Sequence, residues 1–221
     1  MPNQPKIHAM LIIYNEAQFI GQTIKAVDWC DQVVIMDGGY QGFPNAQPQS
    51  TDGTIEIIRN LQQKQDNIKY LTLDKLSNRW LKEAEAMKHI PIGDYILRLD
   101  GDEVLEGRHE LLRDYMIDTN LLPLYQIDSY PPDHPEKHWF LARLTRHTPE
   151  LKLTQRHLTM TNTFVPPYTL AGGRGMVHPF EANIAFVHID HYCDQRDEKR
   201  QSDVKQYDKY YYAHLYPKGY V

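Results

Sequence analysis

Three polar clusters in this chain each follow an apolar run of strand length. They are Tyr14-Asn15-Glu16, Asp37-Gly38-Gly39 and Asp100-Gly101-Asp102. Two carboxylates one residue apart, as in the third cluster, can hold a divalent cation directly or through water, and their hard oxygen atoms suit Mg²⁺ or Mn²⁺. The same pair also occurs in solvated acidic turns, but here a buried run precedes it and Glu103 follows it. This context favours a metal site.

The second cluster has both a structural and a functional interpretation. Asp and Gly end strands and begin helices in many proteins, and Ser50 to Thr54 beyond this cluster supplies further capping residues. In the functional interpretation, Asp37 accepts a hydrogen bond from a base or a ribose. Gly38 then allows the ligand to approach the backbone closely.

A third group of polar residues lies near the C-terminus, where His188, Asp190, His191 and Cys193 follow one another closely. Their spacing does not match a standard zinc signature, and the chain contains no Cys-x-x-Cys motif. We favour a single histidine, His191, that completes the carboxylate site. Packing of one or both histidines between a strand and a helix remains the alternative.

The elements that must position these residues alternate between two periodicities. Apolar runs predict strands, and apolar residues at helical spacing predict helices between them. The predicted strands are 7–14, 33–36, 68–73 and 94–99, and the predicted helices are 19–27, 55–61 and 80–89. This alternation predicts an α/β fold with a mostly parallel, Rossmann-like sheet flanked by helices, which binds ligands beyond the carboxyl ends of its strands.

After residue 120 the alternation fails, and we expect a less regular acceptor region. Strands are predicted at 121–130, 138–145 and 186–192, a long loop or lid at 161–180 and a helical segment at the C-terminus. Residues 40–49 are predicted to be a loop. We therefore expect one compact domain whose two halves are a nucleotide-sugar-binding part, 1–106, and an acceptor-side part, 107–221.

Composition excludes several classes of protein. The 24 Lys and Arg against 29 Asp and Glu give a net charge of −5, which disfavours nucleic acid as a partner. No apolar run approaches the ~18–20 residues of a membrane helix, and the first residues lack the features of a signal peptide. Two cysteines, Cys30 and Cys193, suit a reducing compartment. These features predict a soluble cytoplasmic protein without a transmembrane segment.

Taken in order, these motifs resemble the family-2 glycosyltransferases of GT-A fold, and above all the small bacterial branch typified by lipopolysaccharide-core β-1,4-glucosyltransferases. The matching segments are Tyr14-Asn15-Glu16, Val33 to Gly39 with Ser50 to Thr54, Leu99 to Glu103 and His191-Tyr192. Residues 6–106 carry most of the resemblance.

Two departures from the family pattern stand out. The insertion 40–49 splits a motif that is contiguous in the family. Arg143-Leu144-Thr145-Arg146 is present, but His157 is followed by Leu158 where relatives often have Glu. This second departure leaves the catalytic base open.

The resemblance implies a metal-dependent inverting glycosyltransferase. Such an enzyme moves a sugar from a nucleoside diphosphate sugar, with UDP favoured, to a hydroxyl group of a glycan, a lipid-linked acceptor or a small molecule. Mn²⁺ or Mg²⁺ would be held by Asp100, Asp102 and His191, with Asp102 as the principal ligand. The resemblance implies that the substrate is contacted by Tyr14, Asn15, Glu16, Asp37, Gly38, Asp52, Arg79, Lys82 and Asp100. Glu103 is a candidate for work on the acceptor side, and Glu181 and Asp133 are candidate bases.

Two other functions stay open. A nucleotidyltransferase can share the nucleotide-binding sheet and the metal carboxylates, but it typically has a Gly- and Arg/Lys-rich loop after the first strand. This chain has Tyr14-Asn15-Glu16-Ala17 there. A non-catalytic nucleotide-sugar-binding module would explain the missing Glu after His157, whereas the intact pair Asp100 and Asp102 counts against it. The donor sugar, the linkage and the oligomeric state do not follow from the sequence.

Overall fold

The computed structural model describes residues 4–119, 121–122, 124–136, 139–149, 151–153, 158–162, 165–169, 181–192 and 195–215. Its main element is an eight-stranded sheet with the order β3-β2-β1-β4-β7-β6-β11-β5, and a three-stranded sheet has the order β10-β9-β8. The strands are β1 (Ile7–Ile13), β2 (Gln32–Asp37), β3 (Ile68–Thr72), β4 (Tyr95–Asp100), β5 (Glu103–Gly107), β6 (Leu124–Tyr130), β7 (Trp139–Arg146), β8 (Leu151–Leu153), β9 (Leu158–Asn162), β10 (Val165–Thr169) and β11 (Glu181–His191). The helices are α1 (Ile20–Ala26), α2 (Thr54–Gln62), α3 (Arg79–Met87), a 3₁₀ turn (His109–Leu111), α4 (Leu112–Asp118) and α5 (Glu198–Leu215).

The strands β3, β2, β1 and β4 run parallel, and the remaining strands extend the sheet in mixed directions. Four of the seven neighbouring pairs are parallel, so the sheet is mostly parallel as the sequence predicts. In the register of β1, Ile13 lies opposite Asp37 of β2, and Ile12 lies opposite Asp100 of β4. The carboxyl ends of these three strands therefore meet at one edge of the sheet.

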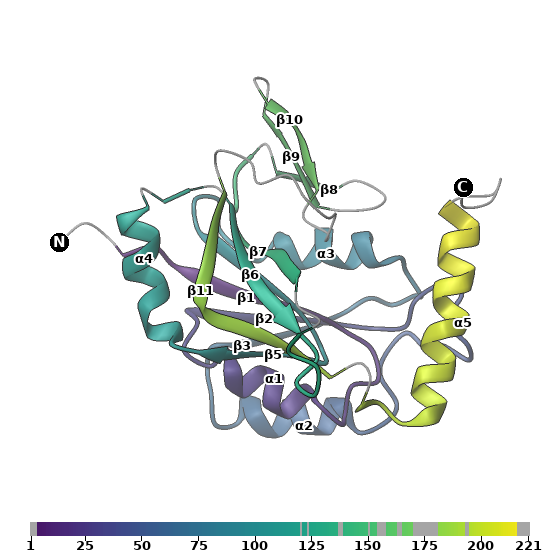
Figure 1. Ribbon diagram of the computed structural model, residues 1–221. Helices are drawn as coiled ribbons and strands as arrows, with labels where there is room; N and C mark the ends of the chain where they lie inside the picture. The colour runs from purple at the N-terminus through teal and green to yellow at the C-terminus, as the bar shows by residue number, and fades with distance from the viewer. Residues whose placement is uncertain are drawn as a thin grey trace.

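Helices cover both faces of this sheet (Figure 1). The alternation along β1 explains why, since Leu11 and Ile13 join the apolar cluster that includes side chains of α1, α2 and α4. Met10 and Ile12 point to the other face, where they pack with Ala86 of α3. All of β1 is buried, which is typical of a central parallel strand. Figure 1 shows α5 standing beside the carboxyl end of β1, away from these helices.

The predicted strands and helices of the first hundred residues are confirmed, as is the loop at 40–49. Strand β5, directly after Asp102, was not expected, and it pairs antiparallel with β11. This pairing places His191 opposite Glu103, so the expected neighbourhood of His191 and the acidic cluster is confirmed.

The continuous loop expected at 161–180 is wrong for the described residues, because β9 ends at Asn162 and β10 spans Val165–Thr169. The two prolines of β10 fall where the register shifts between Val165 and Tyr168. A strand can accept proline at such an irregularity because no ladder hydrogen bond is needed there. Residues 170–180 lie outside the described residues.

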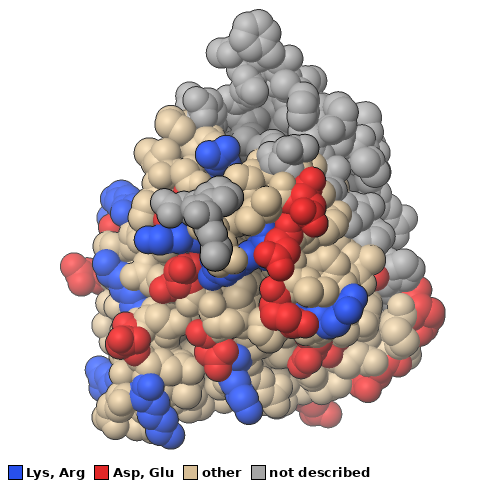
Figure 2. All heavy atoms as spheres, turned by 90° about the vertical axis from the view of Figure 1, so that its left-hand side faces the viewer, with Lys and Arg blue, Asp and Glu red and all other residues tan. Residues whose placement is uncertain are grey.

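The surface and the helices carry two further observations. On the side of the molecule shown in Figure 2, Lys and Arg are interspersed with Asp and Glu over the described residues. This side therefore carries no broad basic patch of the kind that would suit a nucleic-acid backbone. In the described part of the chain, no helix has the length and apolar character needed to cross a membrane.

Candidate functional site

Two carboxylates from different strand ends share two arginines from the C-terminal region. Arg196 Nη2 lies 2.8 Å from Asp102 Oδ2 and 3.3 Å from Glu16 Oε1. Arg200 Nη2 lies 2.8 Å from Glu16 Oε1 and also donates to the carbonyl oxygen of Tyr14 at 2.6 Å. The side chains of both arginines are only 13% exposed. The first turn of α5 and the residues before it therefore close onto the ends of β1 and β4.

The turn after β1 carries Glu16, and its backbone conformation is fixed by hydrogen bonds. Asn15 has φ +53°, a left-handed conformation that Asn accepts more readily than most residues. The backbone N–H of Glu16 donates to Thr54 Oγ1 at 2.9 Å, and that of Ala17 donates to Asp52 Oδ2 at 3.0 Å. The expected substrate residue Asp52 therefore braces this turn from the start of α2.

Gly101 brings the turn after β4 against Glu16. A Cβ atom at Gly101 would lie 2.5 Å from Glu16 Cγ, closer than real Cβ atoms approach. The carbonyl oxygen of Gly101 accepts a hydrogen bond from Thr23 Oγ1 at 3.0 Å. The carbonyl oxygen of Asp102 accepts one from Tyr192 N, also at 3.0 Å. The acidic turn is thereby fixed between α1 and the end of β11.

Glu103 organises the other side of this turn. Its Oε2 accepts the backbone N–H of Asp100 at 2.9 Å, and its Oε1 lies 3.1 Å from His191 Nδ1 and is paired with Arg143. Only 1% of Glu103 is exposed. The role on the acceptor side that the sequence offered for Glu103 stays untested, and the contacts point to a residue that positions its neighbours.

A third ion-pair network links α3 to β4. Asp100 is paired with Arg79, whose Nε also lies 3.1 Å from Glu83 Oε1. Arg98 Nε lies 3.0 Å from the same Glu83 oxygen. Glu83 and Arg98 are buried, so each of these charges depends on its partner for compensation.

Burial dominates the pKa shifts in this region. Burial, with Asp102 nearby, raises the pKa of Glu16 to about 7 against the pull of Arg196 and Arg200. Burial also raises the pKa of Asp102, and Arg196 offsets part of that rise. For Asp100 burial acts in the same direction, but Arg79, Arg143 and Arg98 together outweigh it and hold the pKa of Asp100 below the usual range. Burial lowers the pKa of His191 to about 4, so its ring is neutral at pH 7.

Asp37, expected to bind a base or ribose, is satisfied by the protein itself. It is fully buried, and it accepts hydrogen bonds from Ser50 N at 3.0 Å, Ser50 Oγ at 2.6 Å and Tyr70 OH at 2.8 Å. A Cβ atom at Gly38 would lie 2.6 Å from the carbonyl oxygen of Pro48. The segment that closely approaches the backbone of Gly38 is therefore the 40–49 insertion.

The insertion forms a support for α5. Gln47 N donates to Tyr14 OH at 2.9 Å, and the Tyr14 ring meets Phe43 edge to face at 5.4 Å. Tyr207 of α5 packs on Phe43 at 5.8 Å, and the Arg200 guanidinium lies 4.9 Å from the centre of the same ring. The expected diphosphate contact Lys82 is buried under this support, where Nζ contacts the Gly38 carbonyl oxygen and lies 3.6 Å from the centre of the Tyr40 ring.

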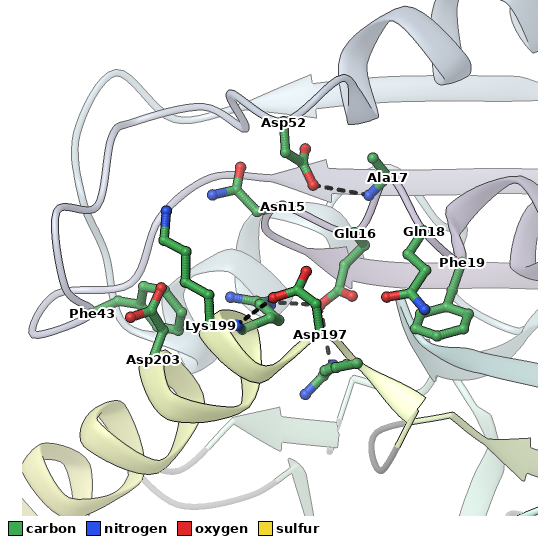
Figure 3. A pocket seen from close by; sticks show the side chains of 12 residues that line it. Asn15, Glu16, Ala17, Gln18, Phe19, Phe43, Asp52, Asp197, Lys199 and Asp203 are labelled. Carbon is green, nitrogen blue, oxygen red and sulfur yellow. Dashed lines mark hydrogen bonds and ion pairs between the residues drawn. The ribbon is translucent and has the colours of Figure 1, made fainter.

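A cavity of about 280 Å³ opens between the turn after β1 and α5. Figure 3 shows the side chains of Asn15, Glu16 and Gln18 on one side, with Asp197, Lys199 and Asp203 from the α5 region on the other. The remaining lining residues are Ala17, Phe19, Phe43, Asp52, Arg196 and Arg200. The cavity therefore brings expected nucleotide contacts together with arginines that the sequence did not single out.

The described residues do not fit a bound metal ion in their present arrangement. Asp100 is paired with Arg79 and Asp102 with Arg196, and the neutral ring of His191 lies 3.1 Å from Glu103. Within the described part of the chain, no group of three His, Cys, Asp or Glu side chains is placed to hold a metal ion. The carboxylate oxygens have the right chemistry for Mg²⁺ or Mn²⁺, but guanidinium groups already balance their charge.

The two candidate bases fall in different places. Asp133 is exposed, and its Oδ2 accepts a hydrogen bond from Gln195 Nε2 at 2.8 Å. Glu181 is the first residue of β11, and its side chain lies outside the described residues, as do Cys193 and His157.

Sequence reasoning missed Arg196 and Arg200. The available signal was the density of charge after residue 194, which resembles that of an ordinary solvated helix.

The comparisons with known proteins concern the fold. No protein-family model matches the chain, and no curated protein matches its sequence. Among solved structures, TarS of S. aureus aligns with 19% identity and a TM-score of 0.45 over 58% of this chain and 22% of its own. TarS 1–349 in complex with UDP-GlcNAc aligns with 22% identity and a TM-score of 0.44 over 57% of this chain and 35% of its own.

A mannosyltransferase from Pyrobaculum calidifontis, in complex with GDP-Man and Mn²⁺, aligns with 16% identity and a TM-score of 0.41 over 60% of this chain and 38% of its own. The chain thus spans 22% to 38% of the length of these three structures. The class defined by the protein's own coordinates is an α/β protein with a mostly parallel eight-stranded sheet flanked by helices.

Proposed function

We propose that this protein is a glycosyltransferase that moves a sugar from a nucleoside diphosphate sugar to a hydroxyl group of an acceptor. One observation carries the proposal: Glu16 and Asp102 meet Arg196 and Arg200 beside a cavity at the carboxyl edge of the sheet. Ligands of open α/β sheets bind at this edge. The order of the polar motifs along the chain, which resembles family-2 glycosyltransferases, supports the same function.

We propose that the transfer inverts the configuration of the sugar. The acceptor oxygen forms a bond to the anomeric carbon while the bond from that carbon to the diphosphate breaks, and the acceptor proton passes to a base. Negative charge grows on the departing diphosphate, so fixed positive groups stabilise the transition state. Asp133 and Glu181 remain the candidate bases. The preference for UDP and the lipopolysaccharide-core branch remain more specific predictions. The sequence also predicts a need for Mn²⁺ or Mg²⁺, which the arrangement of the described residues does not favour.

A donor screen tests the proposal. The melting temperature of the protein would be measured with UDP, GDP and their sugar derivatives, each with Mn²⁺ and with a chelator. A ligand at ~100 times its Kd adds about 2.7 kcal/mol to the free energy of unfolding. Release of nucleoside diphosphate in the presence of candidate glycan, lipid-linked and small-molecule acceptors then measures transfer.

The same screen separates the remaining alternatives. A nucleotidyltransferase would bind nucleoside triphosphates and release pyrophosphate when given a sugar phosphate. A binding module would be stabilised by the donor without releasing nucleoside diphosphate in any condition. If no nucleotide or sugar nucleotide shifts the melting temperature, the proposed function is wrong.

A further inference from the structure

We propose that Arg196 and Arg200 bind the diphosphate of the donor and supply the positive charge there, so that the donor binds without a divalent metal ion. The inference rests on the proposed function and names the groups that recognise its substrate. Both arginines line the cavity, and both approach it from one short stretch around the start of α5.

Arg200 has donor groups to spare. Its Nη2 serves Glu16 and the Tyr14 carbonyl oxygen, whereas its Nε and Nη1 are buried and have no hydrogen-bond partner within the described residues. A buried donor without a partner costs about 1–3 kcal/mol, so an incoming acceptor would be favoured there. Phosphate oxygens match the planar fork of a guanidinium group, which can bind two of them at once.

The carboxylates hold the two guanidinium groups in position. Glu16 Oε1 contacts both arginines, and Asp102 Oδ2 contacts Arg196. The Phe43 ring, 4.9 Å from the Arg200 guanidinium, limits the orientations of that side chain further. A diphosphate would therefore meet cations that are already oriented, which lowers the entropic cost of binding.

Arg196 also occupies the place where a metal ion would have to act. Its Nη2 is 2.8 Å from Asp102, the residue expected to be the principal metal ligand. A cation that bound Asp102 would have to displace this guanidinium group from a buried position, or share the carboxylate with it. Arg196 thus takes the position beside Asp102 that a metal ion would need, and the remaining donors of Arg200 are available to the diphosphate.

The test is nucleotide binding in the presence of a chelator. Dissociation constants of UDP, GDP, uridine and guanosine would be measured by calorimetry for the whole chain, with EDTA and with Mn²⁺. We expect the nucleoside diphosphate that binds, UDP or GDP, to have the same dissociation constant with EDTA as with Mn²⁺. Arg200→Ala should weaken its binding by about 10- to 100-fold, since hydrogen bonds to charged groups are lost, while nucleoside binding stays the same.

Two further variants serve as controls. Lys205→Ala removes one positive charge from an exposed position on α5 and should change affinity less than about twofold. Arg200→Lys keeps the charge without the planar fork and should bind the diphosphate more weakly than the wild type. It also keeps the test decisive if Arg200→Ala fails to fold, which its unfolding curve would show.

The outcomes separate this inference from the proposed function. Binding of UDP or GDP that requires Mn²⁺ and does not change in Arg200→Ala or Arg200→Lys would overturn the inference and leave the glycosyltransferase proposal standing. An equal loss for nucleosides and nucleoside diphosphates would also overturn it, because Arg200 would then act through the fold. If the wild-type protein binds no nucleoside diphosphate in either condition, the proposed function itself fails.

Discussion

Asp37 at the end of β2, Glu16 beyond β1 and Asp102 beyond β4 are all buried. The protein nevertheless compensates the loss of hydration of these carboxylates in two different ways. Asp37 accepts hydrogen bonds from neutral groups of Ser50 and Tyr70. Glu16 and Asp102 instead contact Arg196 and Arg200. Neutral donors fixed by neighbouring elements occupy most of the Asp37 lone pairs, and its side chain is fully buried away from the cavity-lining residues. A guanidinium group has several N–H donors, and Arg200 keeps Nε and Nη1 without a partner within the described residues, so the second region can still bind an anion.

This difference separates a structural strand end from a candidate binding site, although the sequence motifs at both look alike. The donors around Asp37 include a backbone N–H, whose direction follows from the chain path. The guanidinium groups of Arg196 and Arg200 lie at the ends of long side chains, which approach from a separate element. We therefore expect substitutions at Asp37 to act on stability, and substitutions around Arg196 and Arg200 to act on ligand binding.

The largest effect on stability is expected for Glu103→Ala. This change leaves the buried Arg143 without its carboxylate partner and removes the acceptor for Asp100 N, so the free energy of unfolding should fall by about 3–5 kcal/mol. Urea unfolding measures the loss. Glu106→Ala, on an exposed position of the same strand, is the matched control and should stay within about 0.5 kcal/mol of the wild type. Equal stability of the two variants would show that Glu103 does not anchor the charged region.

The isosteric pair Asp37→Asn and Asp102→Asn tests the comparison directly. In Asp37→Asn an amide N–H group faces donors from Ser50 and Tyr70, so stability should fall by about 2 kcal/mol. In Asp102→Asn the loss should be below about 1 kcal/mol, because burial already disfavours the charged form of this carboxyl. Its nucleotide affinity should fall instead, since Arg196 loses an anchor. The reverse pattern would mean that the roles of the two strand ends are exchanged.

The sequence predicts some features of these strand ends and not others. The strands β1, β2 and β4 and the polar residues at their ends follow from apolar runs and local spacing, so the edge of the sheet is predictable. The function of each carboxylate cannot be predicted in this way, because it depends on the side chains that contact the carboxylate in the fold. Arg196 and Glu16 are 180 residues apart, and nothing in a local pattern indicates that contact. The packing of the 40–49 insertion against Tyr207 is hidden for the same reason.

Gly101→Ala should give an intermediate effect in the charged region. The added methyl group would lie 2.5 Å from Glu16 Cγ and 3.1 Å from Ile13 Cγ2, so one of these neighbours must move. Overpacking of this kind costs about 1–3 kcal/mol. Because Glu16 positions Arg200, nucleotide affinity should fall together with stability. Gly93→Ala is a useful comparison, since a Cβ atom there meets nothing within 4 Å and any cost reflects its φ of +101° alone. If Gly101→Ala binds nucleotide like the wild type, the position of Glu16 does not matter for binding.

The last effect is a change of slope with pH and concerns Lys82, which lies between the two regions. Only 1% of this side chain is exposed, and the groups facing its ammonium are the Tyr40 ring, the Gly38 carbonyl oxygen, Asp37 and, at longer range, Arg79 and Arg200. Burial lowers the pKa of Lys82 to about 7, and the attraction of Asp37 offsets only part of that shift.

The sign of the resulting pH dependence follows from proton counting. Above pH 7 the folded protein has released the Lys82 proton, whereas the unfolded chain keeps it up to its ordinary pKa of 10.5. The unfolded state thus binds more protons in this window, and the contribution of Lys82 to the free energy of unfolding rises with pH, by at most about 1.4 kcal/mol per unit. Lys82→Met lacks this proton. Its stability, measured by urea unfolding between pH 7 and about pH 9, should therefore rise less steeply than that of the wild type. Parallel curves for the two proteins would show that Lys82 stays charged in the folded state, held by Asp37. The end of β2 would then contain an ion pair as well, and the contrast between the two strand ends would be one of degree.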